Sequence, residues 1–193
     1  MGSSQTAQKD DCKFVVESRL DPQGGLVLHY TFQNNSGHQI YLFNRLYKEI
    51  EEGPLFDTDP NLVNIELFPK GLLISKKIIA VPPDVDVEKP LLPCTSLVRP
   101  GDSLSETIQL SLPLTTWTPY LVHSGLPPSQ VIRRKARFEI GYFVSSDASQ
   151  SLAQPVRTKQ GDAFYFAPFP VAGQKTVDVE LPLEIPIHSL PQN

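Results

Sequence analysis

The final apolar stretch of the chain, residues 176–187, alternates between apolar and polar positions. Its apolar residues are Val177, Val179, Leu181, Leu183, Ile185 and Ile187. Side chains on a β-strand point alternately to two faces, so this pattern predicts a strand with one face in a core and the other in water. Pro182 and Pro186 lack a backbone N–H, which places this strand at a sheet edge or beside a bulge.

Similar segments recur along the rest of the chain, separated by turn-forming residues, and they predict further strands. They span residues 14–20, 26–32, 39–47, 63–68, 72–81, 104–112 and 138–144. The sequence offers no convincing helix beyond a short turn at 129–135. We therefore predict an all-β protein, an antiparallel immunoglobulin-like β-sandwich of about 8–10 strands with long Pro-rich loops, and a barrel is the alternative architecture.

Length and composition favour a single folding unit. A chain of 193 residues can bury a substantial core without a disulfide or a metal ion. Its 19 prolines disfavour a helical protein. We predict a flexible N-terminal tail over residues 1–12 and a single β-sandwich domain over residues 13–193. Cys12 and Cys94 could pair, but the chain otherwise lacks the character of a disulfide scaffold.

The charge of the chain argues against two classes of partner. The formal net charge is −4, so no global basic field attracts nucleic acid or an anionic membrane surface. No apolar run reaches the roughly 18 to 20 residues that a membrane-spanning helix needs, and the first residues lack the apolar centre of a signal peptide. We therefore expect a cytoplasmic protein, although a native leader could have been removed.

The sequence contains no recognisable catalytic motif. It lacks a Gly-x-Ser-x-Gly elbow, a glycine-rich phosphate loop and a dinucleotide fingerprint. Its four histidines are isolated from one another, and none has the spacing of a paired metal site. We expect no catalytic residues, no metal ion and no cofactor. The only basic cluster, Arg133, Arg134, Lys135 and Arg137, is interpreted as protection against edge aggregation, and a docking site for an acidic partner is the alternative.

Two aromatic groups are candidates for a partner-binding surface. The first is Phe164, Tyr165, Phe166 and Phe169, which alternate with prolines that limit strand pairing. Stiff aromatic side chains on such a segment are typical anchors of an interface, although they could equally fill one end of the sandwich. The second group, Trp117 and Tyr120, lies in a loop rich in proline and threonine and invites the same two interpretations.

Two segments carry a resemblance to a known type of protein. Residues 26–43 read as a strand, an Asn-rich turn and a return strand, and residues 97–108 read as a Pro-Gly turn that starts a later strand. Both are similar to parts of bacterial immunoglobulin-like sandwiches, and the arrangement resembles the intracellular proteinase inhibitor family of bacilli. That resemblance implies a protease-binding module, but no inhibitory-loop residues can be carried across to this chain.

These observations lead to one functional hypothesis and two alternatives. The hypothesis is a non-catalytic module that binds another protein through its loops or an exposed strand edge, as a subunit or regulator in a larger assembly. The first alternative is a carbohydrate-binding module, for which Trp117, Tyr120 and Tyr165 would need to share one exposed face. The second is an enzyme whose site is assembled from distant loops.

Overall fold

The computed structural model describes residues 2–48, 55–121, 130–145, 152–167, 169 and 171–189. Within these ranges most residues lie in β-strands, which confirms the predicted all-β class, and the helical element η1 (Val171–Gly173) is a single 3-10 turn. The strands are β1 (Ser3–Gln8), β2 (Cys12–Leu20), β3 (Leu26–Asn34), β4 (Ile40–Arg45), β5 (Leu55–Phe56), β6 (Asn64–Phe68), β7 (Gly71–Lys76), β8 (Cys94–Val98), β9 (Ser103–Leu110), β10 (Gln130–Val144), β11 (Gln154–Thr158), β12 (Gly161–Tyr165) and β13 (Lys175–Ser189).

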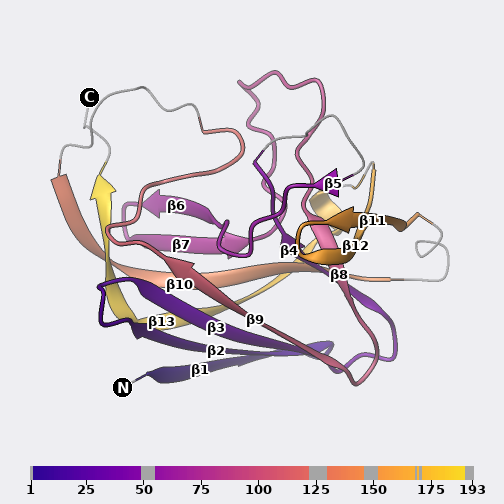
Figure 1. The fold of residues 1–193 in the computed structure, drawn as a ribbon, viewed down its shortest axis with the longest axis horizontal. Coiled ribbons are helices and arrows are strands. Elements are labelled where there is room, and N and C mark those ends of the chain that lie inside the picture. Colours follow the sequence, from indigo (N-terminus) through magenta and orange to yellow (C-terminus); the bar gives the residue numbers. More distant parts are fainter. Residues whose placement is uncertain are drawn as a thin grey trace.

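These strands form two sheets (Figure 1). The smaller sheet has the order β1-β2-β3-β9, and all of its pairs are antiparallel. The larger sheet has the order β5-β11-β12-β8-β4-β10-β7-β6, and β13 pairs with β10 on the side away from β7. Two pairs in it are parallel, β7 with β10 and β5 with β11. The wholly antiparallel arrangement predicted from the sequence is therefore wrong.

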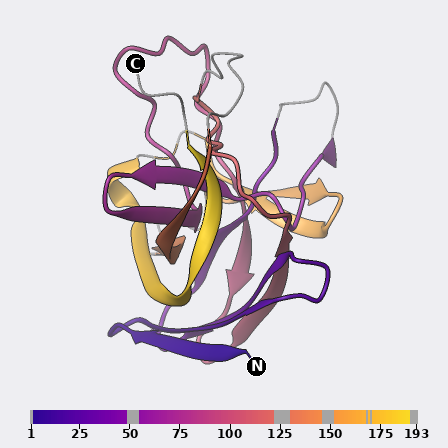
Figure 2. The same cartoon turned by 90° about the vertical axis from the view of Figure 1, so that its left-hand side faces the viewer.

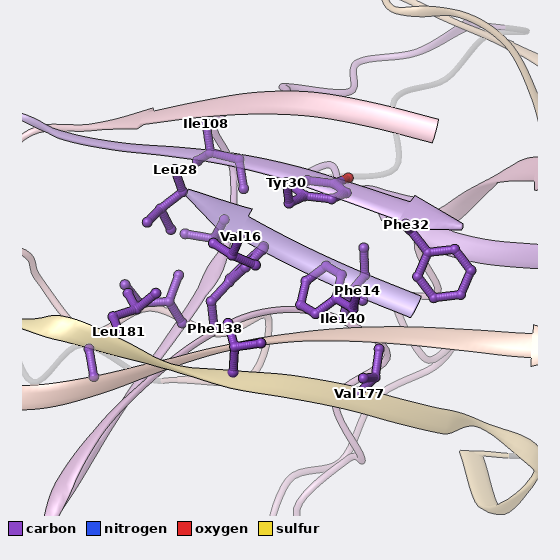
Figure 3. Packing of buried hydrophobic residues seen from close by; sticks show 14 of the residues in the cluster. Phe14, Val16, Leu28, Tyr30, Phe32, Ile108, Phe138, Ile140, Val177 and Leu181 are labelled. Atoms are coloured by element: carbon purple, nitrogen blue, oxygen red, sulfur yellow. The ribbon is translucent and has the colours of Figure 1, made fainter. Parts of the chain in front are cut away.

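Apolar side chains from both sheets meet in one main core, as Figure 3 shows. Phe14 on β2, Tyr30 on β3 and Phe138 on β10 form a triangle of fully buried rings, whose centroids lie 5.6 to 5.9 Å apart. The apolar face predicted for the last strand also reaches this core, through Val177 and Ile185 among others. Burial of these two facing surfaces holds the sheets together.

The larger sheet curls into a half-barrel. Its long strand β13 bends strongly in the view of Figure 2. In the register between β13 and β10, the single residue Ala136 lies opposite the segment from Leu181 to Leu183. Such a bulge bends and twists the strand that carries the extra residues. Pro182 lies within this bulge, in agreement with the position that its missing N–H predicts.

One connecting segment links the two edges of this curled sheet. The backbone N–H of Leu114 donates to Pro186 O at 2.9 Å, on the outer edge of β13. Three residues later, Trp117 pairs with Ile65 on β6 through two backbone hydrogen bonds of 2.7 and 3.0 Å. The segment from Leu114 to Trp117 therefore spans from β13 to β6 and satisfies backbone groups that both edge strands would otherwise leave unpaired.

Three segments differ from the sequence-based expectation. Ser3–Gln8 form strand β1, where a flexible tail was expected over residues 1–12, because pairing with β2 uses backbone groups and needs only the small apolar contact of Ala7. Residues 130–135, expected as a helical turn, belong to β10, whose charged face pairs with acidic β13. The strand Cys94–Val98 lies in a passage read as a Pro-rich loop.

Candidate functional site

The predicted Phe-rich segment packs on the outer face of the larger sheet. Because side chains alternate along β4, Tyr41 and Phe43 point away from the main core that Ile40 and Leu42 enter. Phe166 packs edge-on against Tyr41 with ring centroids 4.9 Å apart, and Phe169 packs against Phe43 at 5.3 Å. The segment after β12 thus covers a second, smaller aromatic core.

Phe143 on β10 extends this outer core. Its ring lies 5.7 Å from that of Phe166 and 5.2 Å from that of Phe169, both in edge-on geometry. Phe164 joins the group through Tyr41, with ring centroids 5.4 Å apart. We refer to Phe143, Phe164 and Phe169 as the aromatic surface, because each of these rings is only half-buried. Phe166, at their centre, is 4% exposed and belongs to the core.

Tyr165 lies between this group and a neighbouring cluster. Because Phe164 and Tyr165 are successive residues of β12, their side chains point to opposite faces of the strand. The Tyr165 ring packs 5.4 Å from Phe56, which in turn lies 5.1 Å from Tyr47. Tyr47 is fully buried and donates a hydrogen bond of 2.8 Å from its hydroxyl to Leu92 O. Tyr165 is half-buried and packs against both the outer core around Phe43 and the cluster around Tyr47.

Trp117 and Tyr120 are placed by the segment that spans the sheet edges. The backbone of Trp117 pairs with β6, and its side chain lines a narrow crevice of about 10 Å³ together with Tyr47 and Leu91. The hydroxyl of Tyr120 accepts a 2.9 Å hydrogen bond from the backbone N–H of Leu91. Both rings are half-buried. Their contacts lie apart from Tyr41, Phe43 and Phe143, so the six predicted residues do not converge on one shared set of neighbours.

A cluster of buried charges, which the sequence reasoning missed, lies between the two sheets. The side-chain nitrogen of Lys76 donates to the carbonyl oxygens of Asn44 and Pro60, at 3.1 and 2.8 Å. It also lies 3.5 Å from Oε2 of Glu106. The same carboxylate oxygen accepts a 2.5 Å hydrogen bond from the hydroxyl of Tyr30. Two strands of the smaller sheet are thereby joined to β7 of the larger one.

The other side of Glu106 is equally well satisfied. Its Oε1 accepts a 2.9 Å hydrogen bond from the side-chain amide of Asn44 and lies 3.4 Å from a guanidinium nitrogen of Arg45. Asn44 in turn accepts a bond from the N–H of Ser96 at 3.1 Å. Both carboxylate oxygens of Glu106 and the ammonium group of Lys76 therefore have partners, as buried charges require.

The ionisation of this cluster reflects its burial. Loss of solvent is the largest influence on Lys76 and lowers its pKa, while the negative charge of Glu106 acts in the opposite direction. Burial, followed by the charge of Glu106, raises the pKa of Tyr30 well above its usual value. Perturbed groups often mark active sites. Here, however, the lysine side chain is completely buried, and its ammonium group contacts two carbonyl oxygens and Glu106.

The sequence contained a signal for this cluster. Lys76 lies two residues after Ile74 and four after Leu72, so its side chain is expected on the same, apolar face of the strand. In the same way, Glu106 lies midway between Leu104 and Ile108 on the apolar face of another strand. Opposite charges at two positions that should face a core predict a buried ion pair, because neither would be stable there alone. To pair these two residues one must also know that their strands face each other, and the alternation of apolar and polar residues does not show this.

Three further observations concern ligands and relatives. Among the described residues, no group of three or more His, Cys, Asp or Glu side chains is arranged to hold a metal ion. Within the same ranges, no helix combines the length and apolar character that crossing a bilayer requires. Comparisons with protein-family models, with curated proteins and with solved structures gave no match for this chain.

Proposed function

We propose that this protein is a non-catalytic, immunoglobulin-like β-sandwich that binds another protein in the cytoplasm, as a subunit or regulator of a larger assembly. The observation that carries the proposal is the aromatic surface formed by Phe143, Phe164 and Phe169. The outer face of a sheet that meets water is ordinarily polar. Here it bears three half-buried phenylalanine rings, of which Phe143 and Phe169 are in contact and Phe164 packs on the neighbouring Tyr41.

The packing of these rings supports a role as anchors. Phe164 packs on Tyr41, Phe169 on Phe43 and Phe143 on Phe166, with ring centroids 5.3 to 5.7 Å apart. Rings that are already fixed lose little conformational entropy when a partner covers their remaining surface. Aromatic residues that are rigid and partly exposed are typical of interface hot spots. A partner with an apolar contact surface is therefore the class of protein that this site favours.

The test uses substitutions that leave the buried centre intact. A photo-crosslinking residue at position 164 is used to capture partners in lysate of the source organism, and capture is compared with a Phe143→Ala, Phe169→Ala background. We expect a specific captured protein to be lost in that background while the circular dichroism spectrum is retained. Val131→Ala and Leu152→Ala serve as the matched control, since these side chains are 51% and 62% exposed. Equal capture in the test and control backgrounds would contradict the proposal.

A further inference from the structure

A groove on the larger sheet lies where the β6–β7 turn meets the bulge between β10 and β13. It has a volume of about 270 Å³. Its walls combine basic and apolar side chains with a single acidic one. The residues that matter for its chemistry are Phe68, Lys70, Lys135, Arg137 and Glu180. The fold holds this groove open because β13 bulges away from β10 at Leu181.

Three cations converge on this groove from two elements. Lys135 and Arg137 are two residues apart on β10 and share the face that points away from the main core, so their Cα atoms are about 7 Å apart. Lys70 precedes β7, which runs parallel to β10 and approaches it closely. A Cβ atom at Gly71 would lie only 3.3 Å from the carbonyl oxygen of Lys135. The glycine thus allows the close approach that brings Lys70 beside Lys135.

The protein's own carboxylates neutralise these cations only in part, although Glu184 and Glu180 lie opposite Lys135 and Arg137 in the register of β13. Within the described part of the chain, neither Lys70 nor Lys135 has a carboxylate oxygen within 4.0 Å, and Arg137 lies 3.4 Å from Asp178. Glu180 is the acidic residue of the lining, against three basic ones. The chain as a whole carries a net charge of −4. A positive groove on a negatively charged protein attracts anionic groups selectively, because walls of low dielectric concentrate its field.

We propose that this groove binds an acidic segment of the protein partner, and the inference rests on the protein-binding function proposed above. Carboxylate groups of the segment contact Lys70, Lys135 and Arg137, and an adjacent apolar side chain packs on Phe68 at the rim. The volume lies near the lower end of ligand pockets, so it suits one or two side chains of a peptide better than a large free ligand. Phe68 is 46% exposed and can make this contact, whereas the protein itself covers Leu73 and Leu181.

The groove and the aromatic surface lie along the same strand. Arg137 and Phe143 share the outer face of β10 and are six residues apart, which corresponds to about 20 Å along a strand. The ion pair between Lys77 and Glu139, with a separation of 2.6 Å, lies between them. An extended partner segment could contact both places, yet each can be altered without touching the other.

The experiment uses a fluorescent peptide in which Glu and Leu alternate, and the same peptide with Gln in place of Glu. Binding to the full chain is measured by fluorescence anisotropy at low and at physiological salt. We expect the charge reversals Lys135→Glu and Arg137→Glu together to weaken binding of the acidic peptide by about tenfold or more. The Gln peptide should bind the unaltered protein about as weakly as the acidic peptide binds the double variant. Added salt should reduce the difference in affinity between the two peptides.

The matched control is Lys13→Glu with Arg19→Glu, which makes the same change in net charge at exposed positions on the smaller sheet. Equal weakening by both double variants, or equal affinity of the two peptides, would overturn the inference. The crosslinking experiment on the aromatic surface separates the two proposals. If Lys135→Glu, Arg137→Glu protein still captures the partner at full yield, the groove inference fails while the protein-binding function stands. If the unaltered protein captures no partner, the function fails.

Discussion

The side-chain nitrogen of Lys76 lies 3.5 Å from a carboxylate oxygen of Glu106, and this ion pair connects the two sheets across the interior. The lysine side chain is completely buried and that of the glutamate is 12% exposed. Glu106→Gln leaves the ammonium group without its main countercharge. We expect this substitution to reduce the free energy of unfolding by about 3–5 kcal/mol, since removal of one partner strands a buried charge. Urea denaturation followed by circular dichroism measures the change.

A double variant tests whether the cost arises from the stranded charge. Lys76→Met combined with Glu106→Gln removes both ionised groups, and we expect it to be more stable than Glu106→Gln alone. A polar residue at 106 is retained because Asn44, Arg45 and Tyr30 still need an acceptor there. The single variant Lys76→Met completes the comparison. If the double variant loses as much free energy of unfolding as Lys76→Met and Glu106→Gln together, the two residues act independently and the ion pair is not the stabilising feature.

The two buried thiols make the fold sensitive to alkaline pH. Burial is the largest influence on both, and it raises the pKa of Cys12 from 9.0 to about 11 and that of Cys94 from 9.0 to about 12. Above about pH 9 the unfolded chain releases these protons while the folded protein retains them. The unfolded state then binds fewer protons, so stability falls as pH rises, by about 1.4 kcal/mol per unit for each thiol until its folded pKa is reached.

Cys94→Ala isolates this contribution. We expect the free energy of unfolding of the variant to fall less steeply than that of the unaltered protein between about pH 8 and about pH 10, by about 1.4 kcal/mol over this range. The slopes of the two proteins must be compared because Lys76 also affects the pH dependence of stability. Its pKa is lowered by folding, so below pH 10.5 it makes the free energy of unfolding rise with pH, opposite to the effect of the thiols. Parallel slopes in urea titrations across this range would rule out a role for the Cys94 thiol.

Gly141 is required by the close approach of its neighbours. A Cβ atom at this position would lie 2.8 Å from the Cβ of Lys77 and would collide with the amide oxygen of Gln174. That oxygen accepts a 2.8 Å hydrogen bond from the N–H of Ile78, and the Gln174 amide nitrogen donates to Ile78 O at 3.2 Å. We expect Gly141→Ala to destabilise the protein by about 1–3 kcal/mol. Thermal denaturation provides the measurement.

Gly37→Ala is the control for this substitution. No atom lies within 4 Å of a Cβ placed at Gly37, so we expect a change of less than about 0.5 kcal/mol. The pair of variants separates steric crowding from the general effect of replacing glycine. A midpoint for Gly141→Ala that matches that of Gly37→Ala would show that Gln174 and Lys77 move aside at little cost.

Local alternation was sufficient to predict most of the strands. It placed the last strand within two residues of its observed bounds, and it assigned the correct buried face to residues such as Val177 and Ile185. It failed at Cys94–Val98, because the preceding prolines hid a strand whose buried residues include Thr95 and Ser96. It also failed at Ser3–Gln8, where backbone pairing and not apolar side chains holds the strand.

Long-range pairing was beyond the reach of the sequence patterns. The strand β10 pairs with β13, β7 and β4, which lie far apart in the chain, and alternation does not indicate which strands become neighbours. The arrangement of the candidate site could not be predicted for the same reason. The Phe-rich segment was singled out correctly as unusual, but only its position over Tyr41 and Phe143 distinguishes the buried Phe166 from the half-buried Phe164.

This distinction gives a last prediction, which concerns the stability cost of removing each ring. Phe166 is 4% exposed and packs against Tyr41, Phe143 and Phe169. We expect Phe166→Ala to cost about 3–5 kcal/mol, since it leaves a cavity in the outer core. Phe164 is half-buried and its ring contact is with Tyr41, so Phe164→Ala should cost about 1–2 kcal/mol. Chemical denaturation of the two variants measures both losses in the free energy of unfolding. Equal costs would mean that the two rings contribute alike to the fold, and that the aromatic surface cannot be altered without also weakening its support.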